Sequence, residues 1–248
     1  ASAGALTMSA SSAIASSGTG AAARLKAATS VTVGDISLAA GSVSITATAG
    51  SILDADVVTT TNDADQDVTA SALRLNAGTA LGDAINHLET NVATLSAQAA
   101  GGGIYLLEAD ALTVGSVAVS VTRVGSQVAQ SDAAQADVRT TGSNGNIVLR
   151  STAGDLTLTD GNIDGVAVSA NGSGSVLLQT LSASKDILVN ADVISGSGNM
   201  SVLGGRSVIF GANADVLMSA ATPGSASIDV EASAGALTMS ASSAIASS

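Results

Sequence analysis

Apolar residues recur along this chain in short triplets of the form apolar-x-apolar, which usually follow Gly, Ser, Asp or Asn. Alternation of this kind is typical of a short β-strand with one buried face. The clearest triplets occupy the second half of the chain and are Ile147-Val148-Leu149, Leu156-Thr157-Leu158, Val166-Ala167-Val168, Val176-Leu177-Leu178, Ile187-Leu188-Val189, Val208-Ile209-Phe210, Val216-Leu217-Met218, Ile228-Asp229-Val230 and Leu237-Thr238-Met239. The pattern predicts an all-β protein made of many very short strands.

The triplets also recur at a regular distance. Every second one starts about 20 residues after the last, at positions 147, 166, 187, 208 and 228. A period of this length, with Gly and Asn at the corners, predicts a coil whose turns stack in parallel, and parallel crossovers favour a right-handed winding. We therefore expect a right-handed parallel β-helix, or β-solenoid, with about 20 residues per coil. The alternative is a β-sandwich, whose strands would be longer and would not keep this period.

One segment has a different period. Its apolar residues follow one another at steps of four, three, four and three, and they are Leu81, Ile85, Leu88, Val92 and Leu95. This spacing is typical of one face of an α-helix. Asp83 is a suitable N-terminal cap, and three glycines follow at 101–103. The spacing predicts a short amphipathic helix over residues 83–98, inserted into the solenoid.

The two ends of the chain are identical. Residues 1–17 and 232–248 both read ASAGALTMSASSAIASS. The simplest interpretation is a tandem array, in which residues 1–231 form one solenoid repeat unit and residues 232–248 begin the next. We then expect units to stack end to end in the same chain without a linker.

Composition excludes several classes of partner. The chain has 20 acidic and 8 basic residues and a net charge of −12, so we expect no nucleic-acid partner. No stretch is apolar enough to predict a membrane span. There is no cysteine, which excludes disulfides and thiolate metal sites.

Groups suited to catalysis are sparse. The one histidine, His87, lies off the apolar stripe of the predicted helix, so we expect a solvated side chain there. His87 and Glu89 would point to different helix faces and would not form a metal pair. The aromatic residues Tyr105 and Phe210 are too isolated to stack a sugar. We expect a protein that is not an enzyme.

One acidic stretch is a candidate calcium site. Asp63, Asp65 and Asp67 alternate as at the start of a calcium loop, where hard oxygens converge on one ion. Val68 replaces the glycine required at the sixth position of an EF-hand, and Arg74 occupies the twelfth. The stretch therefore predicts either a weak, irregular calcium site or a solvated acidic loop. No other cofactor is expected.

Several outward positions carry large apolar side chains. The middle residue of each triplet should face solvent, where a polar side chain is expected. Large apolar residues occupy this position at Val148, Leu188 and Ile209 in one predicted stack and at Leu177 and Leu217 in another. Contiguous exposed apolar surface marks a contact site. We expect this stripe to be covered by the 83–98 helix or by a second copy, as a self-association surface.

The run GTALGDAINHLETNVATLSAQAAGGGIYLLEADALTVGSV, residues 78–117, resembles the repeat units of giant repetitive bacterial surface proteins of the filamentous haemagglutinin type. The Gly-x-aliphatic-x-aliphatic repeats of that family form a right-handed parallel β-helix. Its long members are exported adhesins or cell-surface filaments. The resemblance implies a secreted, extracellular protein.

These observations predict a structural unit of a secreted, tandemly repetitive cell-surface adhesin or extracellular filament. Its role would be reach, adhesion to a cell-surface or glycan ligand, or self-assembly. One alternative is a calcium-dependent adhesin or surface-layer module with a β-sandwich fold. Another is a polysaccharide-active β-helix, which an aligned acidic or aromatic groove would favour.

Overall fold

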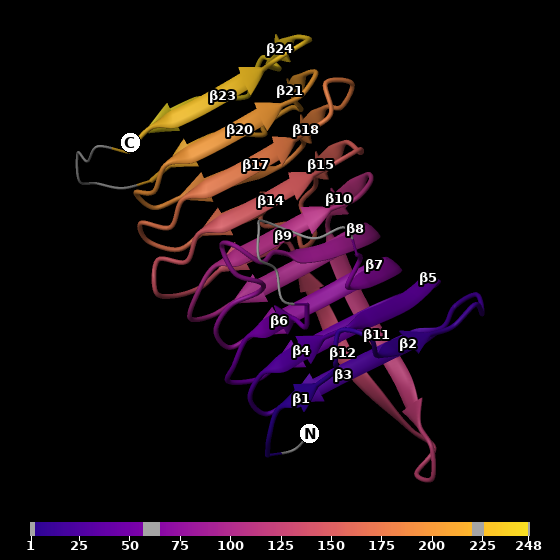
Figure 1. Cartoon of the computed structure of the whole chain (residues 1–248). Helices are drawn as coiled ribbons and strands as arrows, with labels where there is room; N and C mark the ends of the chain where they lie inside the picture. Colours follow the sequence, from indigo (N-terminus) through magenta and orange to yellow (C-terminus); the bar gives the residue numbers. More distant parts are fainter. Residues whose placement is uncertain (1–2, 57–64, 220–225, 248) are drawn as a thin grey trace.

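The computed structural model describes residues 3–56, 65–219 and 226–247 of the chain. These residues form short β-strands joined by turns, and no helix occurs among them. The strands lie side by side in one long stack that begins near the N-terminus and ends near the C-terminus (Figure 1). The prediction of an all-β chain is confirmed for this part of the molecule.

Successive turns of the chain pair in parallel. One sheet contains 20 strands and a second contains three, and the strands of both pair in parallel, whereas an antiparallel pair forms a separate hairpin. The chain therefore winds into a parallel coil, compatible with a β-helix or β-solenoid. This arrangement is not the sandwich of antiparallel sheets considered as the alternative.

The coil has two walls, each a continuous column of paired strands. The first wall contains β1 (Leu6–Thr7), β2 (Ala13–Ala15), β4 (Val31–Val33), β6 (Ile52–Asp54), the first parts of β5 (Asp35–Ala47), β7 (Val68–Ala77) and β8 (Leu88–Ala99), and then β9 (Ile104–Glu108), β14 (Ile147–Ser151), β17 (Val176–Thr180), β20 (Met200–Gly204) and β23 (Ile228–Ala232).

The second wall begins as one strand to a turn and continues as two. It contains β3 (Ala22–Ala27), the second parts of β5, β7 and β8, and then β10 (Leu112–Val114) with β13 (Val138–Thr140), β15 (Leu156–Leu158) with β16 (Val166–Ala170), β18 (Ile187–Val189) with β19 (Asp192–Ser195), β21 (Val208–Phe210) with β22 (Val216–Met218), and β24 (Leu237–Thr238) with β25 (Ile245–Ser247).

Each turn thus has three strand positions, two of which are filled by one long strand in the turns of β5, β7 and β8. The prediction of about 20 residues per coil, which followed from the period of the triplets, is therefore wrong. Ile147 pairs with Val176 and not with Val166. Val176 pairs in turn with Met200, so every third triplet stacks, not every second. The strands were located correctly, but three of them are needed to close a turn around its apolar interior. Shorter turns do occur, as between Val31 and Ile52, which pair directly.

The predicted helix over residues 83–98 is also wrong. Residues 83–87 form an outward loop that leaves Ile85 exposed, and Leu88–Ala99 is the long strand β8. Its buried residues alternate as Leu88, Thr90 and Val92, and after a bend as Leu95, Ala97 and Ala99. The bend places Val92 and Leu95 three residues apart, which imitates a helical step. Parallel pairing with β7 along most of its length outweighs the weak helical preference.

Aliphatic side chains fill the space between the walls. Inward residues of successive strands lie in register, as with Leu149, Leu178 and Val202, and are almost completely buried. Phe210 points inward and is 1% exposed, as its position in a triplet predicts. Corners are equally tight, because a Cβ atom on Gly145 would lie 2.0 Å from the carbonyl oxygen of Gly102. The core is a single apolar column that runs through the stack.

A hairpin interrupts the second wall. The antiparallel strands β11 (Ser116–Arg123) and β12 (Val128–Ala136) leave the coil between β10 and β13. Val114 of β10 and Val138 of β13 pair with Leu95 and Ala97, which are only two residues apart in β8. The hairpin then crosses the outer face of β3, β5, β7 and β8 (Figure 1). From this point onward the second wall keeps two strands per turn.

The three-strand turn has a direct test. We expect the variant with Val148→Cys and Leu177→Cys to form a disulfide under mild oxidation, because these outward residues are in register on adjacent strands. Adjacent strands lie about 4.8 Å apart, which suits a disulfide. The chain has no other cysteine. Mobility on a non-reducing gel and mass spectrometry would detect the bond.

The matched control combines Val148→Cys with Ala167→Cys. These two residues would be neighbours in a coil with two triplets per turn, but in the structure they lie on different walls. A disulfide in this control, without one in the first variant, would contradict the three-strand turn.

Candidate functional site

A partly buried ion pair holds the hairpin against the coil. Arg24 of β3 donates two hydrogen bonds to Asp132 of β12, at 2.9 and 2.8 Å. Ser44 of β5 donates a third, at 2.7 Å. Burial opposes ionisation of Asp132, but these hydrogen bonds and the charges of Arg24 and Arg74 outweigh it and lower the pKa of the carboxyl group. Asp132 is therefore an ionised clasp between two elements far apart in sequence.

Further contacts follow the same seam. Gln135 donates to the carbonyl oxygen of Leu75 at 2.7 Å and accepts from Asn76 at 3.1 Å. Arg74 donates to the carbonyl oxygen of Ala133 at 3.1 Å. Beneath these polar contacts, Val117 and Val119 of β11 are buried. The hairpin thus packs on the outward side chains of the N-terminal turns and covers them.

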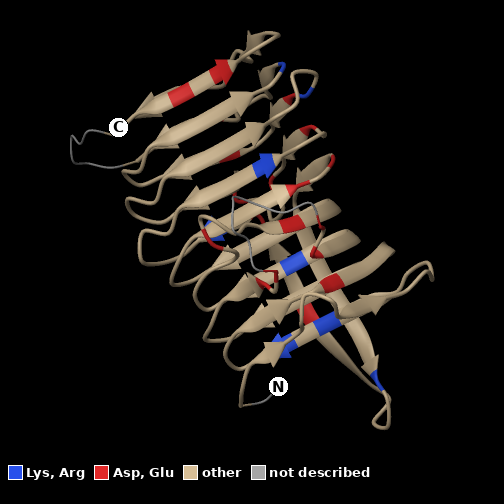
Figure 2. Cartoon of the chain, in the orientation of Figure 1, with Lys and Arg blue, Asp and Glu red and all other residues tan. Residues whose placement is uncertain are grey.

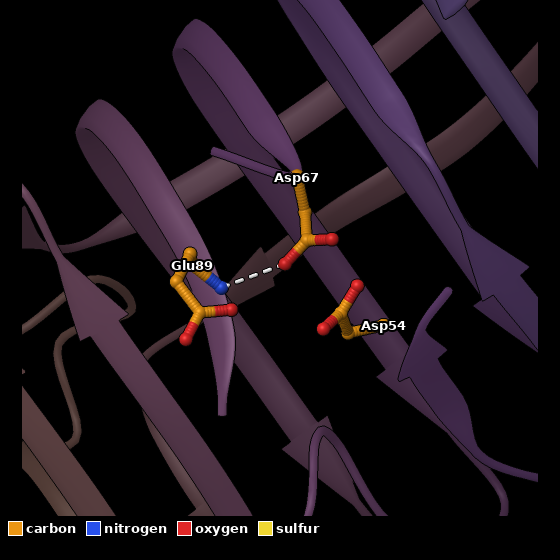
Figure 3. Close-up of side chains that lie close together, drawn as sticks. All are labelled: Asp54, Asp67 and Glu89. Carbon is orange, nitrogen blue, oxygen red and sulfur yellow. Dashed lines mark hydrogen bonds between the residues drawn. The ribbon is translucent and has the colours of Figure 1, made fainter. Parts of the chain in front are cut away.

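Three carboxylates converge in the first wall near the N-terminal end of β8 (Figure 3). Asp54 ends β6, Asp67 precedes β7, and Glu89 is the second residue of β8. One oxygen of each lies within 4.8 Å of the other two. The backbone amide of Glu89 donates to Asp67 at 2.8 Å, and that of Asp56 donates to Asp54 at 2.8 Å.

The environment of this acidic cluster favours a bound proton. Asp67 is 7% exposed and Glu89 is 2% exposed. Burial, followed by the hydrogen bond and the charge of Asp54, raises the pKa of Asp67 to about 10, against the opposing effect of the Glu89 amide. Carboxylate oxygens are also the donors that hard cations such as calcium prefer. The cluster can therefore store a proton at neutral pH or hold a cation in its place.

The predicted calcium residues are only partly described. Asp63 lies outside the described residues. Asp65 and Asp67 line a shallow groove with Asp35 and Asp56, but the carboxylate of Asp67 belongs to the buried cluster with Asp54 and Glu89. The acidic partners of Asp67 come from other turns and not from the alternating run. Calcium binding by this run stays a prediction.

His87 is buried, which contradicts its expected position on a solvated helix face. It is 6% exposed, and its ring stacks on Tyr105 with centroids 6.0 Å apart. Burial and the charge of Arg150 lower its pKa, and Asp83 partly opposes them. The ring is therefore a neutral packing group on the first wall.

Sequence reasoning missed a buried glutamate. Glu108 ends β9 with no exposed surface and accepts hydrogen bonds from the hydroxyl of Thr90 at 2.7 Å and the amide of Val92 at 3.0 Å. Burial raises its pKa to about 7, although these hydrogen bonds favour the ionised form. In the next turns Ser151 and Thr180 occupy the same place and bond corner backbone groups. Glu108 thus fills a corner position normally given to a hydroxyl.

A second missed feature is the loop between β15 and β16. Asp160 accepts from the amides of Asn162, Ile163 and Gly165 at 2.9, 2.6 and 2.8 Å. Asp164 pairs with Arg139 at 2.9 Å. The alternation of Asp160, Asn162 and Asp164 before Gly165 was a readable signal for a loop of hard oxygen donors. Its negative charge is partly balanced by the Arg139 guanidinium.

The outward apolar residues are grouped differently from the prediction. Val148 lies beside Leu177 on the first wall. Leu188 lies beside Ile209 on the second wall, and Ile209 is 36% exposed. Leu217 belongs to β22, beside Ile194. The predicted stack of Val148 with Leu188 and Ile209 is therefore wrong, because those residues lie on different walls. Their role in self-association stays a prediction.

Comparison of the chain with protein-family models, curated proteins and solved structures finds no match. The part of the chain that the structure describes contains no helix able to cross a membrane.

The proton at Asp67 predicts a pH dependence of stability. The folded state binds this proton between the ordinary pKa of 3.8 and the raised value of about 10, whereas the unfolded chain releases it. The free energy of unfolding should then fall as pH rises through this range, by at most about 1.4 kcal/mol per pH unit for this group. Asp67→Asn should make the dependence less steep, measured by urea unfolding in EDTA between pH 5 and 8.

The comparison uses the slope with pH, so an overall loss of stability in the variant does not obscure it. Asp229→Asn, at an exposed position of β23, is the control and should keep the wild-type slope. An equal slope in the wild type and in Asp67→Asn would contradict a proton held at the cluster.

Loss of the Asp132 hydrogen bonds should allow the hairpin to open locally. Asp132→Ala removes the acceptor of Arg24 and Ser44, so the docked hairpin should lose about 2 kcal/mol and its amides should exchange roughly thirtyfold faster. Hydrogen exchange over residues 116–136 would measure this. Ser131→Ala is the control, because Ser131 bonds only Ser120 across the hairpin at 2.9 Å. Unchanged exchange in Asp132→Ala would show that the buried valines alone hold the hairpin.

Proposed function

We propose that this chain is a building block of a long, continuous β-solenoid filament, with a structural and not a catalytic role. The main support for the proposal is the exposed strand edges and apolar side chains at the two ends of the coil. Both end turns leave an edge of paired strands open and expose part of the apolar interior. Solenoids that end in water normally carry a polar cap.

The exposed apolar residues support continuation at both ends. Ile14 in the first turn is 37% exposed, and Leu237, Met239 and Ile245 in the last turn are 46%, 41% and 36% exposed. Their equivalents in the neighbouring internal turns, such as Ile36 for Ile14 and Val208 for Leu237, are fully buried. A further turn at each end would bury these side chains, at about 25 cal/mol for each Å² removed from water.

The edge strands support the same conclusion. Among the described residues, β3 pairs only with β5 and β23 pairs only with β20, so each has one edge of backbone donors and acceptors that no described strand covers. Such edges add further strands readily. The 17-residue identity between the two ends indicates that the following unit is another copy of the same unit, because the start of a second unit stands at the end of the first. We therefore assign residues 1–231 to one repeat unit of the filament and residues 232–248 to the next.

A filament of this kind suits a secreted cell-surface protein that needs reach. The resemblance of residues 78–117 to haemagglutinin-type repeats favours this role, with a right-handed winding and an extracellular location. The outward pair Leu188 and Ile209 offers a lateral contact between filaments that would recur in every unit. Adhesion would then require a ligand-binding region or the repeated outer surface itself.

The proposal predicts the dimensions of a chain with several units. A unit of about eight and a half turns, at about 4.8 Å per turn, should add about 40 Å of length. Chains with one, two and three units should therefore form straight rods whose length increases in equal steps, measured by small-angle scattering and electron microscopy. Flexible beads, or a step far from this length, would contradict the filament.

A further inference from the structure

The segment shared by the two ends shows how one unit joins the next. Leu6–Thr7 and Leu237–Thr238 are equivalent in sequence, and both are strands, β1 and β24. The turn that follows is also the same: Ser12 donates from its amide to Ser9 at 2.8 Å, and Ser243 donates to Ser240 at 3.1 Å. The segment therefore has one local structure, whether another turn lies before it or after it.

At the C-terminal end, the segment pairs with the turn that precedes it. The amide of Val208 donates to the carbonyl oxygen of Ala236 at 3.1 Å, and that of Val216 donates to Ala244 at 2.9 Å. Ala236 and Ala244 correspond to Ala5 and Ala13 in the first turn.

At the N-terminal end, the segment pairs with the turn that follows it. The amides of Leu6 and Met8 donate to Ser30 and Thr32, both at 3.0 Å, and Ser12 accepts from Asp35 at 3.0 Å. None of these groups corresponds to Ala236 or Ala244. The two sets of hydrogen bonds use different backbone groups of the same segment, so one copy can make both at once, as an internal parallel strand does.

The position of the segment in the coil differs between the two ends. From Leu6, successive pairings along the first wall lead through Val31, Ile52, Leu81, Ile104, Ile147, Val176 and Met200 to Ile228, which is eight complete turns. Leu237, the equivalent of Leu6, lies on the second wall above Val208. Its column leads back to β3, not to β1. One repeat is thus eight turns and about half of another.

The end turns have matching shapes for this arrangement. The first turn has two strands on the first wall, β1 and β2, and one on the second, β3. The last turn has one strand on the first wall, β23, and two on the second, β24 and β25. A following unit therefore fits if its two-strand wall continues the second wall and its β3 continues the first wall above β23.

We propose, on the basis of the filament above, that successive units join with their walls exchanged, so that β3 of each unit lies on β23 of the unit before it and each unit is rotated by about half a turn. The occupant of the open C-terminal edge is the next copy of this same unit. The hairpins of successive units then project from opposite faces of the filament.

Charge supports this partner for β23. Its outward residues Asp229 and Glu231 are both exposed. The groove between β3 and the hairpin contains Arg24, Lys26 and Arg123, three of the eight basic residues of the chain. Figure 2 shows the acidic bands on the last strand of the stack and basic bands on its first turn.

Ion pairs and apolar burial have different roles at the junction between units. Exposed ion pairs contribute little to stability, so burial of the apolar ends supplies most of the stability of the junction. Opposite charges on directly adjacent strands instead favour one register, since like charges would face each other in others. Lys26 is exposed on the outward face of β3, so it is the basic residue that we expect beside Asp229 or Glu231.

The experiment uses a two-unit chain, residues 1–231 followed by residues 1–248. Carbodiimide joins a lysine directly to a carboxylate in contact with it. We expect a cross-link between Lys26 of the second unit and Asp229 or Glu231 of the first, found by mass spectrometry in the monomeric fraction. The 248-residue chain should not give it, because its β3 and β23 lie at opposite ends of the stack. Lys26→Arg should remove the cross-link while keeping the charge, and Lys185→Arg should leave it unchanged.

A second measurement does not depend on Lys26. Ser126→Cys places one thiol at the tip of each hairpin for a gold label, in a chain with no other cysteine. In a chain of four units, labels should alternate between opposite sides of the rod. Labels in a single row, or a straight rod without the Lys26 cross-link, would contradict the proposal that the walls are exchanged, but would still agree with the proposal of a continuous filament. Separate flexible units would overturn the filament itself.

Discussion

The structure depends on one requirement: the inward aliphatic side chains of each turn have to be covered by the turns on either side. A turn of three short strands cannot hide its own apolar residues, but in-register stacking buries them almost completely, as at Leu149 and Leu178. Parallel pairing and ladder alignment follow from the same requirement. So does the condition of the ends, where Leu237 and Ile14 have a neighbour on one side only.

The polar features are concentrated where the coil departs from its simplest form. The hairpin splits the second wall between Val114 and Val138, and the partly buried Asp132 joins it to Arg24 and Ser44, which are far away in the sequence. Glu108 and the acidic cluster occupy the turns next to the loop that precedes β8. These groups are buried because neighbouring turns cover them, and this burial raises the pKa values of Asp67 and Glu108.

The hairpin does more than cover the outer face of the coil, because the number of strands per turn in each wall changes near the point where it is inserted. Before it, the second wall has one strand per turn, and after it the same wall has two. The first wall changes in the opposite sense, because β9 pairs with both Leu81 and Leu88 and so joins two strand positions into one. The last turn therefore has the shape of the first turn with its walls exchanged. A single insertion thus influences how one unit can follow another.

The sequence by itself determined the strands and the faces of this protein. Alternation located β14, β15, β17 and β18, assigned their inward residues, and placed Phe210 in the core, because side-chain direction along a strand has a period of two residues whatever the strand pairs with. Only the tertiary structure decided which strands stack. Closing a turn is a non-local event, so the triplet spacing did not distinguish two strands per turn from three. For the same reason it did not show that Asp54, Asp67 and Glu89 would meet, that β8 would be a strand, or that Asp132 would reach Arg24 across 108 residues of chain.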